Sequence, residues 1–99
     1  MAVVDIIEIW WLTVCTFFEA SGVTGVFERS PTDRPNPSCN LNLRRGEYEA
    51  DLLVWESGEA EFAIAEPNGA VHQQHFEDVR NPAVLEAILM RLSTLARVG

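Results

Sequence analysis

This sequence of 99 residues contains no lysine. Seven arginines stand against fifteen Asp and Glu side chains, so the formal net charge is −8. Such a surface repels phosphate backbones, which argues against a nucleic-acid partner. The charge suits a basic protein partner, but solubility alone also accounts for an acidic surface, and the composition leaves both explanations open.

Cysteine is scarce, with only Cys15 and Cys39, and neither belongs to a CxxC motif. Both lie at positions that the surrounding pattern predicts to be buried. Two small buried thiols in a reducing compartment are therefore favoured over a disulfide bond.

The apolar N-terminus, MAVVDIIEIWWLTVCTFF, lacks the features of a signal peptide and of a membrane span. It has no basic n-region, and Asp5 and Glu8 interrupt the apolar run. The apolar stretch is also shorter than the ~20 residues that cross a bilayer. We therefore expect a buried amphipathic helix in a cytoplasmic protein.

Motifs of catalytic and cofactor-binding sites are also lacking. The sequence has no Gly-rich phosphate loop and no GxSxG nucleophile motif. His72 and His75 have the spacing of a metal-binding pair on a helix, but on a strand this spacing sends them to opposite faces. We expect no enzyme activity, no cofactor and no metal; a small enzyme built on these histidines and the acids is the less favoured alternative.

Hydrophobic residues make up 47% of the chain, which is enough for one globular domain over residues 1–99. Residues 3–20 show one narrow polar stripe on an otherwise apolar helix, and a Ser-Gly pair ends it. A second helix is predicted for NPAVLEAILMRLSTLARVG, with Asn81 as its N-cap and Pro82 at its first position.

Between the helices, apolar and polar residues alternate as they do in strands. Five strands are predicted, at residues 23–29, 39–45, 47–55, 59–65 and 70–76. Gly25 weakens the first, the Pro-rich residues 30–38 form a loop, and Asn68-Gly69 favours a type I′ hairpin turn. The order predicts an α+β two-layer sandwich, in which both helices cover one face of an antiparallel meander. The facing of the last strand is left open.

The uncovered face of this meander carries acidic side chains around one tryptophan. No Lys or Arg lies between Gly46 and Val79, and open water screens acids that acid–base catalysis would need in unequal environments. An aromatic ringed by polar groups is instead typical of an interface hot spot. The alternative, that residues 30–38 cover Trp55, stays open. The predicted partner-binding residues are Glu47, Glu49, Asp51, Leu53, Trp55, Glu56, Glu59 and Glu61.

The first helix has a wider apolar arc than one packing face needs. Trp10 and Trp11 are adjacent, so they point about 100° apart and cannot both face one neighbour. We expect the helix to be covered on two sides, by its own sheet and by something else. A homodimer through Trp10 and Trp11 would make the protein a self-associating structural or adaptor domain, which is the alternative function.

Three segments resemble one family: NPSCNLNL at 36–43, VWESGEAEFAIAE at 54–66, and HFEDV at 75–79 before a terminal amphipathic helix. They are similar to the small immunity proteins of the TriTu family. The likeness runs from about residue 30 to the C-terminus, VWESGEAE is its most specific part, and the N-terminal helix agrees in type and position. The polar surface here is Arg and Glu rather than Lys and Glu, so polar contacts need not carry over residue by residue.

The resemblance implies a function as well as a family. Its members are bacterial cytoplasmic proteins, each paired with a secreted toxin, an ADP-ribosyltransferase that attacks elongation factor Tu and is associated with type VI secretion. The immunity protein binds the toxin and neutralises it without catalysis. The implied partner is therefore a cognate protein toxin, with neither a nucleic acid nor a membrane.

Overall fold

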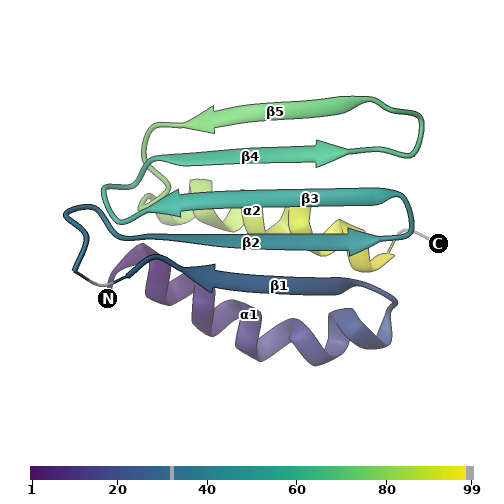
Figure 1. Cartoon of the computed structure of the whole chain (residues 1–99), viewed down its shortest axis with the longest axis horizontal. Coiled ribbons are helices and arrows are strands. Elements are labelled where there is room, and N and C mark those ends of the chain that lie inside the picture. Colours follow the sequence, from purple (N-terminus) through teal and green to yellow (C-terminus); the bar gives the residue numbers. More distant parts are fainter. Residues whose placement is uncertain (32, 98–99) are drawn as a thin grey trace.

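The computed structural model describes residues 1–31 and 33–97. The strands form one antiparallel sheet in sequential order, and both helices lie on the same face of it (Figure 1). The predicted α+β sandwich is thereby confirmed. The bounds are α1 Val3–Ala20, β1 Thr24–Arg29, β2 Ser38–Arg45, β3 Tyr48–Trp55, β4 Ala60–Ala65, β5 Val71–Phe76, α2 Pro82–Ser93 and a 3₁₀ turn, η1, Thr94–Arg97.

Helix α1 uses one side of its apolar surface for the core. Gly22 ends the helix with a φ of +89°, and the N–H of Val23 donates to the carbonyl of Phe18 at 2.9 Å. This is the glycine-terminated helix end that the Ser-Gly pair predicts. The buried residues of the helix are Val3, Val4, Ile7, Trp11 and Phe18.

Helix α2 begins as predicted, because the Asn81 side chain accepts from the N–H of Ala83 at 2.9 Å and Pro82 follows the cap. It does not continue as one α-helix toward the C-terminus. The hydroxyl of Thr94 donates to the carbonyl of Arg91 at 2.6 Å where the chain tightens into η1. The last two positions of the predicted helix, 98–99, lie outside the described residues.

The turn between β4 and β5 is not the predicted type I′ turn. That turn needs a positive φ at both central residues, but among the described residues only glycines have one, here Gly69 at +89°. The Asn68 side-chain oxygen accepts from the N–H of Ala70 at 2.9 Å, and the N–H of Glu66 closes the hairpin on the carbonyl of Ala70 at 2.9 Å. The loop therefore has one residue more than the prediction required.

The core lies between the helices and the three central strands. The buried residues stand at every second position of these strands, as the strand period predicts, while the inward-facing Tyr48 and Ile64 are half-buried. The buried strand residues are Cys39, Leu41, Leu43, Ala50, Leu52, Val54, Ala60 and Phe62. The C-terminal residues that meet them are Leu85, Ile88, Leu92, Leu95 and Ala96.

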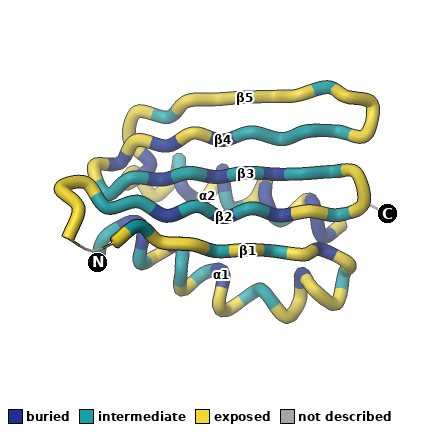
Figure 2. Tube along the Cα trace, in the orientation of Figure 1, coloured by how far each residue is buried: buried dark blue, intermediate teal, exposed yellow. Residues whose placement is uncertain are grey.

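Strand β5 lies beyond this core. Its residues are exposed on both faces of the sheet, apart from the half-buried Phe76 (Figure 2). Its register settles the facing that the sequence left open: Gln74 lies opposite the buried Phe62, so His72, Gln74 and Phe76 share the helical side. Arg91 of α2 reaches this side, 4.7 Å from the Phe62 ring and 3.3 Å from the Gln74 side-chain oxygen.

Gly25, predicted to weaken β1, is also a packing site. A Cβ atom there would collide with the Trp11 ring and would lie 3.0 Å from a methyl group of Leu43. Glycine within a strand often marks such a close approach of another group. The missing side chain lets α1 come close to β1 and bury its second tryptophan.

Candidate functional site

The candidate site is the outer face of the sheet, which we define as the side that carries no helix. Strand register brings side chains of neighbouring strands together there. One row runs Asn42, Asp51, Ala63 and Gln73, and the next runs Asn40, Leu53, Glu61 and His75. Val26 and Glu28 of β1 continue these two rows, so the face is built across all five strands and not by the β3–β4 hairpin alone.

The acids of the outer face are not bare. Asn42 donates to Glu49 at 2.8 Å and to Asp51 at 3.3 Å, and Asn40 donates to Asp51 at 3.2 Å. Arg44 forms an ion pair with Glu49 at 3.1 Å. Although no Lys or Arg lies between Gly46 and Val79, Glu49 thus has a cationic neighbour, which the adjacent strand supplies. The alternating Asn-x-Asn-x-Arg pattern of β2 carried this signal in the sequence.

Glu49 shows what this partnership does to a carboxylate. The hydrogen bond from Asn42, with the charge of Arg44 beside it, holds the pKa of Glu49 below its usual value. The ionised form is thus favoured, and Glu49 is a positioned negative charge at neutral pH. The environments of the acids are therefore less uniform than a fully solvated face would make them.

His72 and His75 lie on opposite faces of the sheet, as predicted. The Nδ1 atom of His75 lies 2.6 Å from a carboxylate oxygen of Glu61, and this hydrogen bond raises the pKa of His75. His72 faces Glu66 at 3.5 Å. Within residues 1–31 and 33–97, no three or more His, Cys, Asp or Glu side chains are grouped so that they could hold a metal ion.

Leu53 and Trp55 are half-buried rather than fully exposed on the outer face. The Pro-rich loop is tied to the turn that follows Trp55: the N–H of Glu56 donates to the carbonyl of Pro37 at 2.8 Å. In the same turn, a further backbone N–H donates to the side chain of Asn36 at 3.1 Å. The indole keeps part of its surface open, so it is available to a partner while a loop of its own chain lies beside it.

The β3–β4 turn is held from its other side as well. Gly58 is buried with a φ of +104°, and a Cβ atom there would collide with the Asp78 carboxylate. The N–H of Val79 donates to the carbonyl of Gly58 at 2.7 Å. The segment VWESGEAE is thus the point where two loops meet the sheet, which fixes the position of Trp55.

The predicted partner-binding residues do not form a single patch. Glu47 lies in the β2–β3 turn, and Glu56 and Glu59 lie between β3 and β4, all outside the strands. The β2–β3 and β3–β4 turns are at opposite ends of the sheet (Figure 1). The predicted residues that share the outer face are Glu49, Asp51, Leu53, Trp55 and Glu61.

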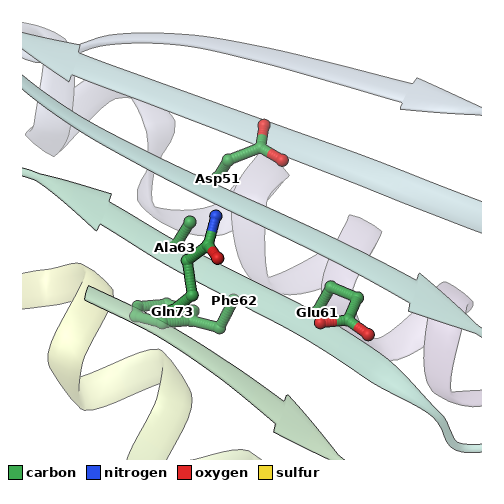
Figure 3. A pocket seen from close by; sticks show the side chains of 5 residues that line it. All are labelled: Asp51, Glu61, Phe62, Ala63 and Gln73. Carbon is green, nitrogen blue, oxygen red and sulfur yellow. The ribbon is translucent and has the colours of Figure 1, made fainter. Parts of the chain in front are cut away.

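A hollow of about 310 Å³ lies on the outer face between β3 and β5 (Figure 3). Ala63 lies between Asp51 and Gln73 in the row across the strands, and its small methyl group leaves the space open. Glu61 lines the hollow from further along β4, and Phe62 contributes from the same strand. Gln73 is not among the predicted site residues, because β5 shows no alternation from which its facing could be predicted.

The two adjacent tryptophans of α1 have different surroundings. Trp11 is 6% exposed and belongs to the core, so it is not available for the predicted dimer contact, whereas Trp10 is half-buried. Other apolar side chains of α1 face solvent: Ile9 is 50% exposed, Leu12 68% and Phe17 61%. A second hollow, of about 470 Å³, lies between the helices, lined by Ile6, Trp10, Arg80, Pro82, Leu85, Glu86 and Leu89.

Both cysteines carry free thiols, as predicted. Cys39 is buried, and its burial raises the pKa of the thiol to about 12, so it stays protonated at neutral pH. Cys15 is half-buried, in contrast to the predicted burial.

None of the helices in the described part of the chain has the length and apolarity needed to cross a membrane.

Comparison with protein families gives a match to the model described as "Immunity protein TriTu", over residues 5–94. The match begins within α1 and ends in η1, so it also covers the N-terminal helix, which the resemblance included only by type and position. No curated protein and no solved structure matches the chain.

Proposed function

The chain belongs to the immunity protein TriTu family, and from this membership we propose that it binds and neutralises a cognate protein toxin. The family match over residues 5–94 is the observation that carries the proposal. The proposed toxin is an ADP-ribosyltransferase, the class that the resemblance implies, and the proposed place of action is the cytoplasm. The chain inhibits by stoichiometric binding and not by catalysis.

The outer face is the proposed contact surface, with the acidic turns at its ends. Neither helix covers it, and its half-buried Leu53 and Trp55 provide the apolar centre that interface hot spots have. Opposite charge on the toxin would raise the rate of association, which matters for an inhibitor of a toxin that acts at few copies. The proposed contact residues are Glu47, Glu49, Asp51, Leu53, Trp55, Glu56, Glu59 and Glu61.

Inhibition by occupation of the toxin's cleft follows from the same chemistry. ADP-ribosyltransferases bind a dinucleotide diphosphate, and basic groups suit a cleft that holds its phosphates. Asn42 already holds Glu49 and Asp51 in place, so these carboxylates lose little freedom when they meet such groups. A positioned pair of carboxylates can therefore occupy the place of the phosphates.

Co-expression with the product of the neighbouring gene tests this function. We expect a stable complex of one copy of each protein, in which ADP-ribosyltransferase activity falls in proportion to the immunity protein added. A neighbouring gene that encodes an active toxin of this class, but forms no complex with this chain, would reject the proposal.

Charge reversal tests the surface separately from the function. The double variant Glu59→Arg/Glu61→Arg should bind the toxin more weakly while keeping its fold, because exposed strand and turn positions tolerate polar exchange. The matched control is Glu19→Arg/Glu86→Arg, which makes the same change of net charge on the helical side. Equal weakening by both would assign the effect to net charge, and no weakening by the first would exclude this face.

Self-association through α1 is the second candidate function. It is favoured by the exposed side chains of Ile9, Leu12 and Phe17, which leave one side of the helix uncovered. Light scattering at micromolar concentration tests it, since a strict monomer excludes a structural role of this kind. A monomer that binds toxin would leave the first proposal standing alone.

A further inference from the structure

The β5 edge of the sheet lacks the features that block strand pairing. Natural proteins protect exposed edges with lysine, proline, bulges or a covering element. The strand VHQQHF contains neither residue, and it pairs with β4 over six consecutive positions without a bulge. No helix lies over it, and its residues are exposed apart from the half-buried Phe76 (Figure 2).

The β4–β5 register shows which backbone groups of β5 point outward. The N–H of Glu66 donates to the carbonyl of Ala70, so this pair is hydrogen-bonded. Hydrogen-bonded and non-bonded pairs alternate along an antiparallel ladder. The residues whose N–H and C=O groups are directed toward β4 are therefore His72, Gln74 and Phe76.

The other half of the strand presents a free ladder. The N–H and C=O groups of Val71, Gln73 and His75 point away from β4, and the side chains of the same residues lie on the outer face. Gln73 also lines the hollow beside Asp51 (Figure 3). A strand added at this edge would thus continue the proposed contact surface without a gap.

We propose that an extended, basic segment of the cognate toxin adds to the free edge of β5 as a sixth strand. This inference rests on the proposed function, since it names how the same partner is recognised. Main-chain hydrogen bonds to Val71, Gln73 and His75 supply affinity, and alternate side chains of the added strand supply specificity.

The charges around β5 favour a basic strand. Glu61 lies beside the strand on the outer face, Asp51 lines the hollow with Gln73, and Glu77 follows the strand. Glu66 faces His72 on the helical side, and Asp78 is paired with Arg80 at 2.8 Å. Arg91, which reaches Gln74, lies on the helical side. Basic side chains of an added strand that point to the outer face therefore meet carboxylates.

The same charges disfavour a second copy of this chain. Antiparallel pairing of two β5 strands would bring Glu77 and Asp78 of one copy toward the hairpin of the other, where Glu66 lies. Each chain also carries a formal net charge of −8. Pairing between copies brings like charges together, while pairing with a basic toxin segment neutralises them.

Hydrogen exchange by NMR tests the proposal residue by residue. In the free protein the amides of His72 and Gln74 should exchange slowly, and those of Val71, Gln73 and His75 quickly. Saturation with catalytically inactive toxin should slow the second set by about tenfold or more. Complex formation with unchanged exchange at these amides would overturn strand addition but leave toxin neutralisation intact, and no complex at all would reject the function itself.

Protection of the same three amides without toxin, together with the mass of a dimer, would overturn the proposal in favour of a second copy. A matched pair of variants gives an independent readout. Gln73→Pro removes an outward N–H at a position where an edge strand tolerates proline, while Gln73→Thr changes the side chain and keeps the N–H.

We expect Gln73→Pro to weaken toxin binding by about tenfold and Gln73→Thr to change it by less than about threefold. Equal loss in both would indicate side-chain contact, and binding unchanged in both would exclude pairing at this edge. Circular dichroism checks that Gln73→Pro is folded; if it is not, the exchange pattern of the native chain decides.

Discussion

The two edge strands of the sheet, β1 and β5, hold equivalent places in the topology but differ in how the chain closes them. Helix α1 lies against β1, where Trp11 packs on Gly25. Arg29, at the end of β1, pairs with Asp5 at 2.9 Å and with Glu8 at 3.1 Å. Strand β5 has no helix on either face (Figure 1).

This difference follows from the width of the helical layer. Two helices cover about four strands, because neighbouring strands lie about 5 Å apart and packed helices about 10 Å apart. A fifth strand therefore extends beyond the core, and its sequence, VHQQHF, has polar residues on both faces. The chain fixes one edge by packing and ion pairs, and it leaves the other edge open to a partner.

The largest expected effect is the difference in stability between a substitution in the core, on β4, and one at the paired position on β5. Phe62→Ala should lower the free energy of unfolding by about 3–5 kcal/mol, because it empties core volume beneath Arg91. Gln74→Ala, at the paired position on β5, should change it by less than about 0.5 kcal/mol. Urea unfolding measures both, and a similar loss in the two variants would show that β5 is as much a part of the core as β4.

Gly25→Ala should have the next largest effect, since it acts where α1 packs on the closed edge. The added methyl group overlaps the Trp11 ring, and overpacking of this kind costs about 1–3 kcal/mol. Thermal unfolding and Trp fluorescence report the loss and the displacement of the indole. Gly69→Ala is the control in an open turn: nothing lies within 4 Å of its Cβ, so any loss there reflects the φ of +89°.

Arg29→Gln should have a smaller effect. It removes two partly exposed ion pairs between β1 and α1, and such pairs contribute about 0.2–1 kcal/mol each. The loss should shrink at high salt, because screening weakens the native pairs. A loss that does not depend on salt would show that the stem of Arg29 acts by packing instead.

The sequence predicted the fold well because its periodicities are strong where the core is. Leu41, Leu52 and Phe62 lie at inward-facing positions of three neighbouring strands in which apolar and polar residues alternate, and all three are buried as predicted. The Asn81 cap and the glycine end of α1 follow local hydrogen-bonding rules that hold without tertiary contacts.

The remaining features depend on contacts between distant segments. The packing role of Gly25 could not be predicted, because nothing in the local sequence shows that Trp11 approaches it. The partners of Asp51 and Glu49 come from β2, so they require the strand register. The facing of Gln73 could not be predicted, because a strand exposed on both faces has no alternation. The contact surface with the toxin is untested by the fold and stays a prediction.

The smallest expected effect concerns the ion pair that links β5 to β4. The protonated ring of His75 donates from Nδ1 to a carboxylate oxygen of Glu61, 2.6 Å away, and this hydrogen bond raises the pKa of His75 above its ordinary value. Because the pKa of His75 is higher in the folded than in the unfolded chain, protonation of His75 stabilises the fold. This stabilisation is fully present at pH values below the unfolded pKa of about 6.5, and it is lost as the pH rises through the folded-state pKa. The melting temperature of the native chain should therefore exceed that of His75→Gln by more at pH 6 than at pH 9.

Glu61→Gln is the control, because it removes the largest cause of the raised pKa and should reduce this pH dependence while keeping a polar side chain; the charges of Glu77 and Glu59, which also raise the pKa, remain. A difference between native chain and His75→Gln that is constant from pH 6 to pH 9 would contradict the assignment. The corresponding tie of β1 uses Arg29, whose pKa is raised further above its already high value by Asp5 and Glu8, so it keeps its charge throughout this range. The ion pairs of β1 thus depend on Arg29, which does not titrate in this range, while the ion pair of β5 depends on His75, which does. Mildly alkaline conditions should therefore loosen β5 before β1.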